Sequence, residues 1–183
     1  MADAESPEVT VSSERVYQGK RISVRLEHVR LSDGTESTRD IVDHPDAVVI
    51  LAVDDEGNVL FVRQYRKAPE IELLELPAGV MDPGETEPLK SAQRELREET
   101  GYAAGELTPL GSFYSAPGTM TELLYCFLAR QLTYDPLPAD DDERIELERM
   151  SFADAVAAAR AGLFQDSKTL ASLFLAAPYL SNE

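Results

Sequence analysis

Apolar and polar positions alternate in the amino-terminal part of the chain. Over residues 22–26 every second side chain is apolar, which is the period of a half-buried strand. The alternation slips near His28, where we expect a bulge. The turn residues 32–35 predict a hairpin that returns through residues 35–42. Because an isolated hairpin is marginally stable in water, this segment is expected to pack on the main body or on a partner chain.

The rest of the chain interleaves strand and helix patterns. Residues 89–100 form a helical pattern that stops at Gly101, a favoured residue just past a helix end. The other expected helices span 152–161 and 167–177. Apolar or alternating runs predict strands over 47–53, 59–63, 71–76, 123–132 and 145–149. The predicted class is therefore mixed α/β, with helices that flank a sheet.

The same patterns predict three parts of the chain. Residues 1–13 are acidic and polar and read as a disordered lead-in. Residues 14–45 form an amino-terminal antiparallel β-hairpin domain, and residues 46–183 form the main domain. With 183 residues the chain is long enough for one sizeable core.

Charge and composition exclude several classes of protein. The net charge is −17, so the chain lacks the basic face of a general nucleic-acid binder. It contains no apolar run of roughly 20 residues that could cross a bilayer. The acidic start is not a secretory signal, and the single cysteine fits a reducing compartment, so we expect a cytoplasmic protein. That cysteine, Cys126, lies in an apolar run and is expected to be a buried strand thiol.

Three glutamates share one face of the helix predicted over 89–100. At about 100° per residue, Glu98 and Glu99 lie within about 60° of Glu95, on either side of it. Like charges at these spacings repel, and Arg94 offsets part of the repulsion through an i, i+4 pair with Glu98. We therefore expect an acidic face that opens into a cleft, where Mg²⁺ or Mn²⁺ would compensate the charge. A solvated surface helix is the alternative, and the glycines that flank the segment count against it.

The segment around this helix resembles the Nudix box, Gly-x5-Glu-x7-Arg-Glu-U-x-Glu-Glu-x-Gly-U, where U is a bulky aliphatic residue. The matching residues are Gly79, Glu85, Arg94, Glu95, Leu96, Glu98, Glu99 and Gly101, with Tyr102 in the last bulky position. In one departure, eight residues rather than seven separate Glu85 from Arg94. We expect the additional residue in the loop before Pro88, which can open the helix. Segments that resemble the ADP-ribose pyrophosphatase branch of the Nudix hydrolase superfamily lie at 62–66, 74–79, 115–122 and 166–170.

The resemblance implies a fold, an assembly and a reaction. The fold would be a Nudix-type α/β/α sandwich with a mixed sheet, preceded by the small amino-terminal β domain. In similar enzymes that domain is exchanged between two subunits, so a homodimer is implied. The implied reaction is metal-dependent hydrolysis of the pyrophosphate bond of ADP-ribose to AMP and ribose 5-phosphate. Metal ions would polarise the phosphoryl oxygens and activate the attacking water.

The resemblance also implies which residues carry this chemistry. The metal ligands would be Glu95, Glu99 and the backbone carbonyl of Ala78, with Glu98 close by. The catalytic carboxylates would be Glu98, Glu99 and an acidic residue of the 140–143 loop.

Glu143 is the first choice for the catalytic base, and Asp141 and Asp142 are its rivals. A solvated acidic loop is the other interpretation of this run of acids.

Substrate contacts are expected from four residues. Arg63 and Arg66 are suited to bidentate contacts with phosphates, although ordinary surface arginines are nearly as good an interpretation. Pro117 and Glu122 lie in the loop that resembles the substrate loop of the branch. Another nucleoside diphosphate sugar, such as a GDP-hexose, is the alternative substrate. A non-catalytic ligand sensor is the alternative of another class, but such proteins usually lose box glutamates.

Overall fold

The computed structural model describes residues 6–138 and 144–180, and the chain divides into two compact units. Unit 1 consists of Met1–Pro45 together with Tyr114–Glu122. Unit 2 consists of Asp46–Phe113 together with Leu123–Glu183. The second segment of unit 1 is far from the first in the chain, and the apolar pattern gives no sign of their association.

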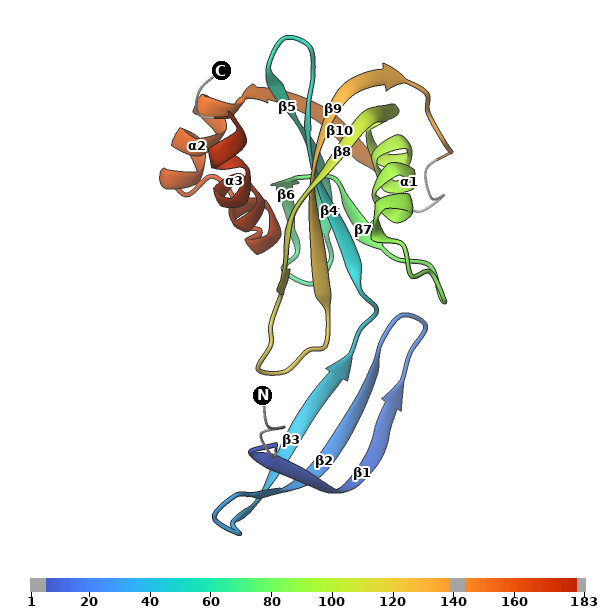
Figure 1. The fold of residues 1–183 in the computed structure, drawn as a ribbon, viewed down its shortest axis with the longest axis vertical. Helices are drawn as coiled ribbons and strands as arrows, with labels where there is room; N and C mark the ends of the chain where they lie inside the picture. The colour runs from blue at the N-terminus through green and yellow to red at the C-terminus, as the bar shows by residue number, and fades with distance from the viewer. Residues whose placement is uncertain (1–5, 139–143, 181–183) are drawn as a thin grey trace, which may run out of the picture. The chain divides into compact units, whose positions relative to one another are not determined.

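Unit 1 contains a three-stranded antiparallel sheet in the order β1-β2-β3 (Figure 1). Its strands are β1 (Glu8–Gln18), β2 (Ser23–Leu31) and β3 (Glu36–Asp43). The predicted hairpin corresponds to β2 and β3. Strand β1 corrects the expected disordered lead-in over 1–13, because residues 8–13 belong to a strand that pairs with β2. Backbone pairing does not require apolar side chains, and a third strand gives the hairpin the stability it lacks alone.

The slip in the apolar alternation of β2 reflects an irregularity on its neighbour. The register between β1 and β2 shifts between Thr10 and Ser12, so Val11 is the extra residue. It lies opposite Val29 and His28 of β2. The bulge expected near His28 is therefore present at this place in the sheet, but β1 carries it.

Residues 114–122 are held to the end of β3 by backbone hydrogen bonds. Val42 forms a parallel bridge with Met120. Its N–H donates to the Thr119 carbonyl at 2.8 Å, and its carbonyl accepts from the Thr121 N–H at 3.1 Å. The His44 N–H donates to the Thr121 hydroxyl at 2.9 Å. These bonds explain why the segment belongs to unit 1.

Unit 2 is built on a mixed seven-stranded sheet whose main path is β10-β5-β4-β9-β8 (Figure 1). Strand β6 pairs with β5, and β7 pairs with β4. The β4–β9 pair is parallel, whereas β5 is antiparallel to β4, β6 and β10. The strands are β4 (Ala47–Val53), β5 (Asn58–Arg66), β6 (Ile71–Glu75), β7 (Ala78–Val80), β8 (Tyr102–Tyr114), β9 (Leu123–Tyr134) and β10 (Ile145–Ser151). The helices are α1 (Pro88–Thr100), α2 (Phe152–Arg160) and α3 (Ser167–Leu180).

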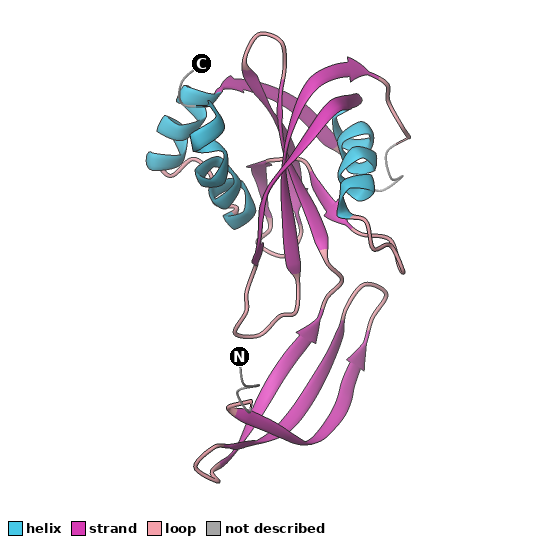
Figure 2. Cartoon of the chain, viewed as in Figure 1, coloured by secondary structure: helices cyan, strands magenta, loops and turns pink. Residues whose placement is uncertain are grey.

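Strand β4 is the centre of the core, and all of its residues are buried. Val48 and Ile50 pack in one apolar cluster with α1. Val49 and Leu51 point to the other face and pack with α2 and α3. One helix therefore covers one face of the sheet and two helices cover the other, as Figure 2 shows. The predicted α/β/α sandwich with a mixed sheet is confirmed.

Pro77 divides the predicted strand 71–76 from a short strand that the apolar pattern did not reveal. A proline has no N–H to donate to a β ladder. Its carbonyl accepts instead from the Ile50 N–H at 2.9 Å. The chain crosses here from β5, the partner of β6, to β4, the partner of β7. Gly79, opposite Val48, then lies on the face that α1 covers, whereas the Ala78 side chain, opposite Val49, packs on the other face.

Strand β8 was also not predicted from the pattern. It contains Gly105, Pro109 and Gly111, which are poor strand formers. Strand β9 next to it contains Cys126, which is buried as expected. Desolvation raises the pKa of this thiol to about 11, although a hydrogen bond to Ser172 acts in the opposite direction. Cys126 is therefore a protonated core residue.

Candidate active site

Helix α1 carries the predicted metal ligands, and local chemistry sets both of its ends. Pro88 lies in the first turn, where its missing N–H costs no hydrogen bond. The helix ends at Gly101, which has a left-handed φ of 80° and donates its N–H to the Arg97 carbonyl at 3.1 Å. The buried face consists of Ser91, Ala92, Glu95, Leu96, Glu99 and Thr100. Two of the three box glutamates on this helix, Glu95 and Glu99, thus belong to the buried face.

The Glu95 and Glu99 side chains pack against strand β7. Each residue is 9% exposed, so these two carboxylates are largely buried, whereas the Glu98 side chain is 23% exposed. The Ala78 N–H donates to Glu99 Oε2 at 2.9 Å. Gly79 passes so close to Glu95 that a Cβ at position 79 would overlap the carboxylate. A side chain at position 79 would therefore displace the Glu95 carboxylate from its present place.

Arg94 pairs with several carboxylates at this face. Its Nη1 is 2.7 Å from Glu98 Oε2 and 2.8 Å from Glu95 Oε1. The predicted i, i+4 pair with Glu98 is confirmed. Nη2 donates to the Val80 carbonyl at 3.1 Å, and Nε is 3.7 Å from Asp82. Desolvation would lower the pKa of Arg94, but the charges of Glu95 and Glu98 raise it above its ordinary value.

Glu85, the first glutamate of the box, also reaches α1. The fully buried Ser91 hydroxyl donates to Glu85 Oε2 at 2.5 Å. Ser91 lies about one helical turn before Glu95, on the same buried face. Gly84, with a φ of 85°, allows the sharp turn that precedes Glu85. The additional residue before Arg94 is therefore accommodated in the loop without moving Glu85 away from the helix.

The donor set at this face fits a hard divalent cation. Within residues 6–138 and 144–180, no three His, Cys, Asp or Glu side chains converge closely enough to hold a metal ion by themselves. Mg²⁺ does not require such a cage, because it commonly takes one or two carboxylates and fills its other positions with water and substrate phosphates. The predicted ligands Glu95, Glu99 and the Ala78 carbonyl are oxygen donors of that kind, and they would hold the ion together with water and substrate.

A second group of charges joins β5, β6 and α3. Arg66 Nε donates to Glu75 Oε1 at 2.8 Å, and Arg66 Nη2 donates to Glu75 Oε2 at 2.7 Å. Lys168 also pairs with Glu75, and its Nζ is 3.0 Å from Asp166 Oδ2. Glu75 is 1% exposed, so this carboxylate is held among charged partners inside the protein. We call these four residues the Glu75 quartet.

The protonation of the Glu75 quartet follows from its contacts. Desolvation alone would raise the pKa of Glu75, but the hydrogen bond from Arg66 and the charge of Lys168 outweigh it and lower the pKa. The hydrogen bond to Glu75 raises the pKa of Arg66, and the charges of Glu99 and Asp166 add to this effect. Arg66, a predicted phosphate contact, thus lies within electrostatic reach of the box glutamate Glu99.

Sequence reasoning gave no role to Glu75, Lys168 or Asp166. Two signals were present. Glu75 is an acid that follows the apolar pair Leu73-Leu74 in a strand, and Lys168 lies in the first turn of a helix, where the helix dipole disfavours a cation. Neither signal names the partner, because the two residues are 93 positions apart in the chain.

The other predicted phosphate contact, Arg63, has different surroundings. Its Nε donates to Glu148 Oε1 of β10 at 2.5 Å. That hydrogen bond raises the pKa of Arg63, and Glu72 and Glu146 add smaller effects. Arg66 is therefore paired with the buried Glu75, whereas Arg63 is paired with Glu148 of β10.

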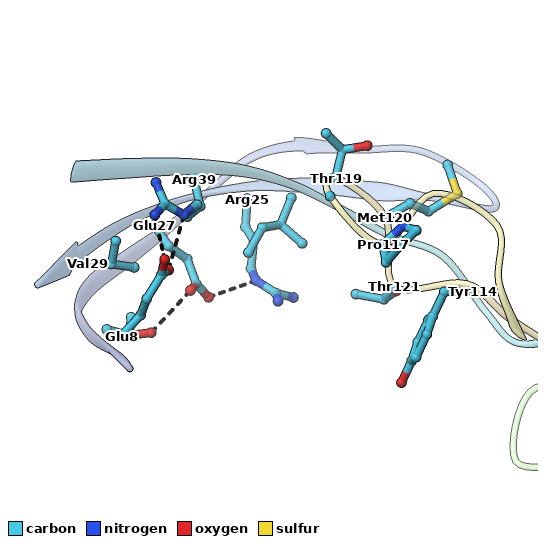
Figure 3. A pocket seen from close by; sticks show the side chains of 13 residues that line it. Glu8, Arg25, Glu27, Val29, Arg39, Tyr114, Pro117, Thr119, Met120 and Thr121 are labelled. Atoms are coloured by element: carbon cyan, nitrogen blue, oxygen red, sulfur yellow. Dashed lines mark hydrogen bonds and ion pairs between the residues drawn. The ribbon is translucent and has the colours of Figure 1, made fainter. Parts of the chain in front are cut away.

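Unit 1 contains a pocket of about 650 Å³ (Figure 3). Arg25 pairs with Glu27 at 2.8 Å and Arg39 pairs with Glu8 at 2.5 Å, so both cations have acidic partners within the unit. The volume is in the range of small-molecule sites. Among the predicted substrate contacts, Pro117 lines this pocket. The other lining residues are Thr10, Val29, Ile41, Tyr114, Gly118, Thr119, Met120 and Thr121.

Glu122, the last predicted substrate contact, lies in the same unit but is paired with a histidine. Its Oε1 is 3.3 Å from His44 Nδ1, and both side chains are 17% exposed. His44 Nδ1 also lies 2.7 Å from the Pro45 carbonyl. Sequence reasoning gave His44 no role, and the structure gives it a contact with Glu122.

The predicted catalytic base Glu143, with its rivals Asp141 and Asp142, lies outside the described residues. The described segment before it is bound to the end of α1. Arg97 Nε donates to the Asp135 carbonyl at 2.9 Å, and the Leu137 N–H donates to the Arg97 carbonyl at 3.3 Å. After the loop, β10 begins at Ile145, opposite Gln64 of β5.

Comparison with protein families matches nearly the whole described chain. A model of the NUDIX domain matches residues 43–173. A model of the nucleoside diphosphate sugar hydrolase N-terminal domain matches residues 8–42. The first match covers α1 and its box glutamates, and the second covers β1, β2 and most of β3.

Named relatives and a solved structure agree with these matches. The chain is 41% identical over 164 residues to the ADP-ribose pyrophosphatase of Bacillus subtilis (strain 168), with 88% of each chain covered. It is 32% identical over 136 residues to the GDP-mannose pyrophosphatase of Cronobacter sakazakii (strain ATCC BAA-894), with 68% of this chain and 69% of that one covered. The fold matches the crystal structure of an ADP compounds hydrolase with a TM-score of 0.87 at 24% identity, over 99% of this chain and 98% of that one. With these matches and the box glutamates packed on β7, the chain belongs to the Nudix family and is a Nudix hydrolase.

Proposed function

We propose that this Nudix hydrolase cleaves the pyrophosphate bond of ADP-ribose and releases AMP and ribose 5-phosphate. The observation that carries the proposal is the packing of Glu95 and Glu99 against the β7 backbone, which gathers hard oxygen donors on one helix face. The choice of substrate is supported by the 41% identity to a relative named ADP-ribose pyrophosphatase.

Dependence on a divalent metal is general among Nudix hydrolases, and for this chain we propose Mg²⁺ or Mn²⁺. Glu95, Glu99 and the carbonyl oxygen of Ala78 would hold the ion, with Glu98 close by. When bound, such an ion polarises phosphoryl oxygens and lowers the pKa of a coordinated water. Arg94 orients Glu95 and Glu98 through its ion pairs.

The reaction consumes one water molecule. The water oxygen forms a bond to one phosphorus, the P–O–P bridge breaks, and the bridging oxygen leaves with the other phosphate. The water proton passes to a carboxylate, for which Glu143 is the proposed base. Glu98 and Glu99 are the other proposed catalytic carboxylates.

The proposed substrate contacts are Arg63, Arg66, Pro117 and Glu122. Arg66 is the best supported of them, because its guanidinium is fixed by Glu75 and lies within electrostatic reach of Glu99. A fixed guanidinium binds phosphate oxygens with a small loss of side-chain entropy.

We also propose a cytoplasmic homodimer in which the amino-terminal unit is exchanged between subunits. The support is the small sheet of unit 1, which is too small for a large core of its own. In the part of the chain that the structure describes, no helix is long and apolar enough to span a membrane. Light scattering coupled to gel filtration tests the dimer, and the mass of one chain would contradict it.

A second candidate function keeps the chemistry and changes the sugar. The relative named GDP-mannose pyrophosphatase, 32% identical, favours a GDP-hexose as the alternative substrate. A non-catalytic sensor is less well supported, because Glu95, Glu98 and Glu99 are all present.

The deciding experiment is product analysis by chromatography. Purified protein is incubated with Mg²⁺ and, separately, with ADP-ribose, ADP-glucose, GDP-mannose, NADH or a dinucleoside polyphosphate. We expect AMP and ribose 5-phosphate from ADP-ribose, and no product when a chelator is present. Faster cleavage of GDP-mannose would replace the substrate but keep the chemistry. A folded, metal-loaded sample that cleaves none of these compounds would favour the sensor.

A further inference from the structure

The register of β5 and β6 places Arg66 and Glu75 on one face of the sheet. Arg66 pairs with Ile71 and Val62 pairs with Glu75, so Arg66 and Glu75 are separated by an even number of positions along the ladder. The Arg66 side chain therefore runs along the strands to reach Glu75, and both of its hydrogen bonds there are shorter than 2.9 Å. The Arg66 side chain is fixed at its Cα by β5 and at its guanidinium by Glu75, so it has little freedom to move.

The guanidinium is held by one edge. Of its five N–H donors, Glu75 accepts one from Nε and one from Nη2. The Nη1 group takes part in neither bond, and the Arg66 side chain is 37% exposed. Arg66 can therefore keep its two hydrogen bonds to Glu75 and donate from Nη1 to an anion.

Lys168 occupies a position that its own helix does not favour. It is the second residue of α3, where the helix dipole repels a cation. Its side chain is 14% exposed and pairs with both Glu75 and Asp166. Asp166 in turn accepts from the Thr169 N–H at 3.0 Å, as a helix N-cap does. The contacts of Lys168, rather than helix stability, explain a cation at this position.

The same turn of α3 also binds the chain at Leu76, just before β7. The fully buried Thr169 hydroxyl accepts from the Leu76 N–H at 2.9 Å. Two residues later, the Ala78 N–H donates to Glu99. The start of α3 therefore holds the Glu75 end of the short segment before the box, and Glu99 of α1 holds its Ala78 end.

We propose that Glu75 and Lys168 are positioning residues for the hydrolytic reaction: their buried ion pair fixes one edge of the Arg66 guanidinium so that the other edge is presented to a substrate phosphate. This inference rests on the proposed function. Neither Glu75 nor Lys168 touches the substrate in this account, and both act through Arg66. Lys168 balances the charge of Glu75, so that the positive charge of Arg66 is available to the phosphate.

The kinetic test compares Lys168→Met with Lys90→Met. Lys90 forms an exposed pair with Glu87, so its change removes the same charge away from the quartet. For ADP-ribose we expect Lys168→Met to raise KM about ten-fold, with kcat changed less than about two-fold, because a phosphate contact held in ground and transition state is weakened. Lys168→Arg should restore most of the loss, and Lys90→Met should resemble the wild type.

A double-mutant cycle separates positioning from a general structural role. In an Arg66→Ala background, Lys168→Met should raise KM by less than about two-fold, because its effect passes through Arg66. Equal effects in both backgrounds would overturn the proposal, as would an unchanged KM. If Lys168→Met fails to fold, Glu75→Gln with Lys168→Met removes both charges of the ion pair and must show the same dependence on Arg66.

A second measurement does not depend on turnover. The Nε–H resonance of Arg66, assigned by its loss in Arg66→Lys, should exchange slowly with solvent in the substrate-free protein because it is bound to Glu75. We expect exchange about ten-fold faster in Lys168→Met and unchanged in Lys90→Met. Unchanged exchange in Lys168→Met overturns the proposal. If the wild type cleaves no nucleoside diphosphate sugar, the proposed function fails, and this resonance still decides whether Lys168 fixes Arg66.

Discussion

Two clusters of charge in unit 2 meet their electrostatic demands in different ways. The Glu75 quartet combines two carboxylates with two cations of the same chain, linked in sequence by three ion pairs. At the face of α1, Glu95, Glu98 and Asp82 share the guanidinium of Arg94, while Glu99 accepts from a backbone N–H. A cluster with matched internal charges is suited to hold structure in place. A cluster rich in carboxylates is suited to bind a cation from solution.

The largest effect is expected at the carboxylate-rich cluster. Glu99→Gln keeps an acceptor for the Ala78 N–H but removes the charge of a metal ligand. We expect kcat to fall about a thousand-fold, or ~4 kcal/mol of transition-state stabilisation, while the far-ultraviolet spectrum stays native. The exposed Glu106→Gln is the matched control and should keep full activity. Wild-type kinetics in Glu99→Gln would remove the site assignment.

The matched cluster should respond in stability. Glu75→Gln leaves Lys168 and Arg66 without their shared buried carboxylate, and we expect a loss of about 3 kcal/mol in the free energy of unfolding. Urea titration measures this loss. Adding Lys168→Met should recover part of it, because the pair is then removed together. A double variant that is less stable than Glu75→Gln would show that the two charges do not compensate each other.

Metal removal tests whether the carboxylate-rich cluster binds a cation, by its effect on the stability of the protein. Saturating Mg²⁺ at about a hundred times its Kd should stabilise the wild type by about 2.7 kcal/mol relative to chelated protein, because it binds the native state. Thermal melts with and without chelator give this difference. Glu99→Gln should lose most of the shift, whereas Lys90→Met should keep it. A shift that persists in Glu99→Gln would place the cation elsewhere.

The pH dependence of stability should contain a contribution from Glu75. Its pKa lies below the ordinary value of 4.5, against desolvation, because of Arg66 and Lys168. A carboxyl with a lowered folded-state pKa contributes stability above its unfolded-state pKa, and this contribution is lost as the pH falls below about 4.5. Urea titrations from pH 7 to pH 3 should show a shallower acid loss in the Glu75→Gln, Lys168→Met variant than in the wild type. Parallel curves would contradict this.

The smallest effect is expected in unit 1. The Glu8–Arg39 pair has the same chemistry as Glu75–Arg66, but its side chains are 38% and 37% exposed. Exposed pairs contribute little, because water screens them and two side chains lose freedom. Glu8→Gln should therefore leave the urea midpoint unchanged within error. A loss comparable to that of Glu75→Gln would mean that burial does not explain the difference between the two pairs.

Local patterns determined most of the fold and the centre of the candidate site. A helix of period 3.6 that begins at Pro88 and ends before Gly101 is defined within its own residues. The same holds for the Arg94–Glu98 pair and for the face shared by Glu95, Glu98 and Glu99. The apolar runs of β4 and β9 are long enough to be recognised as strands without any knowledge of their partners.

Tertiary structure decided what depends on distant partners. Strand β1 is mostly polar and forms because its backbone can pair with β2. The charge of Glu75 is compensated by Lys168, which is 93 residues away in the chain. The burial of Glu95 and its close contact with Gly79 depend on the packing of α1 against β7. Sequence periodicity records which way a side chain points on its own element, but the partner it meets there is set by how the elements pack.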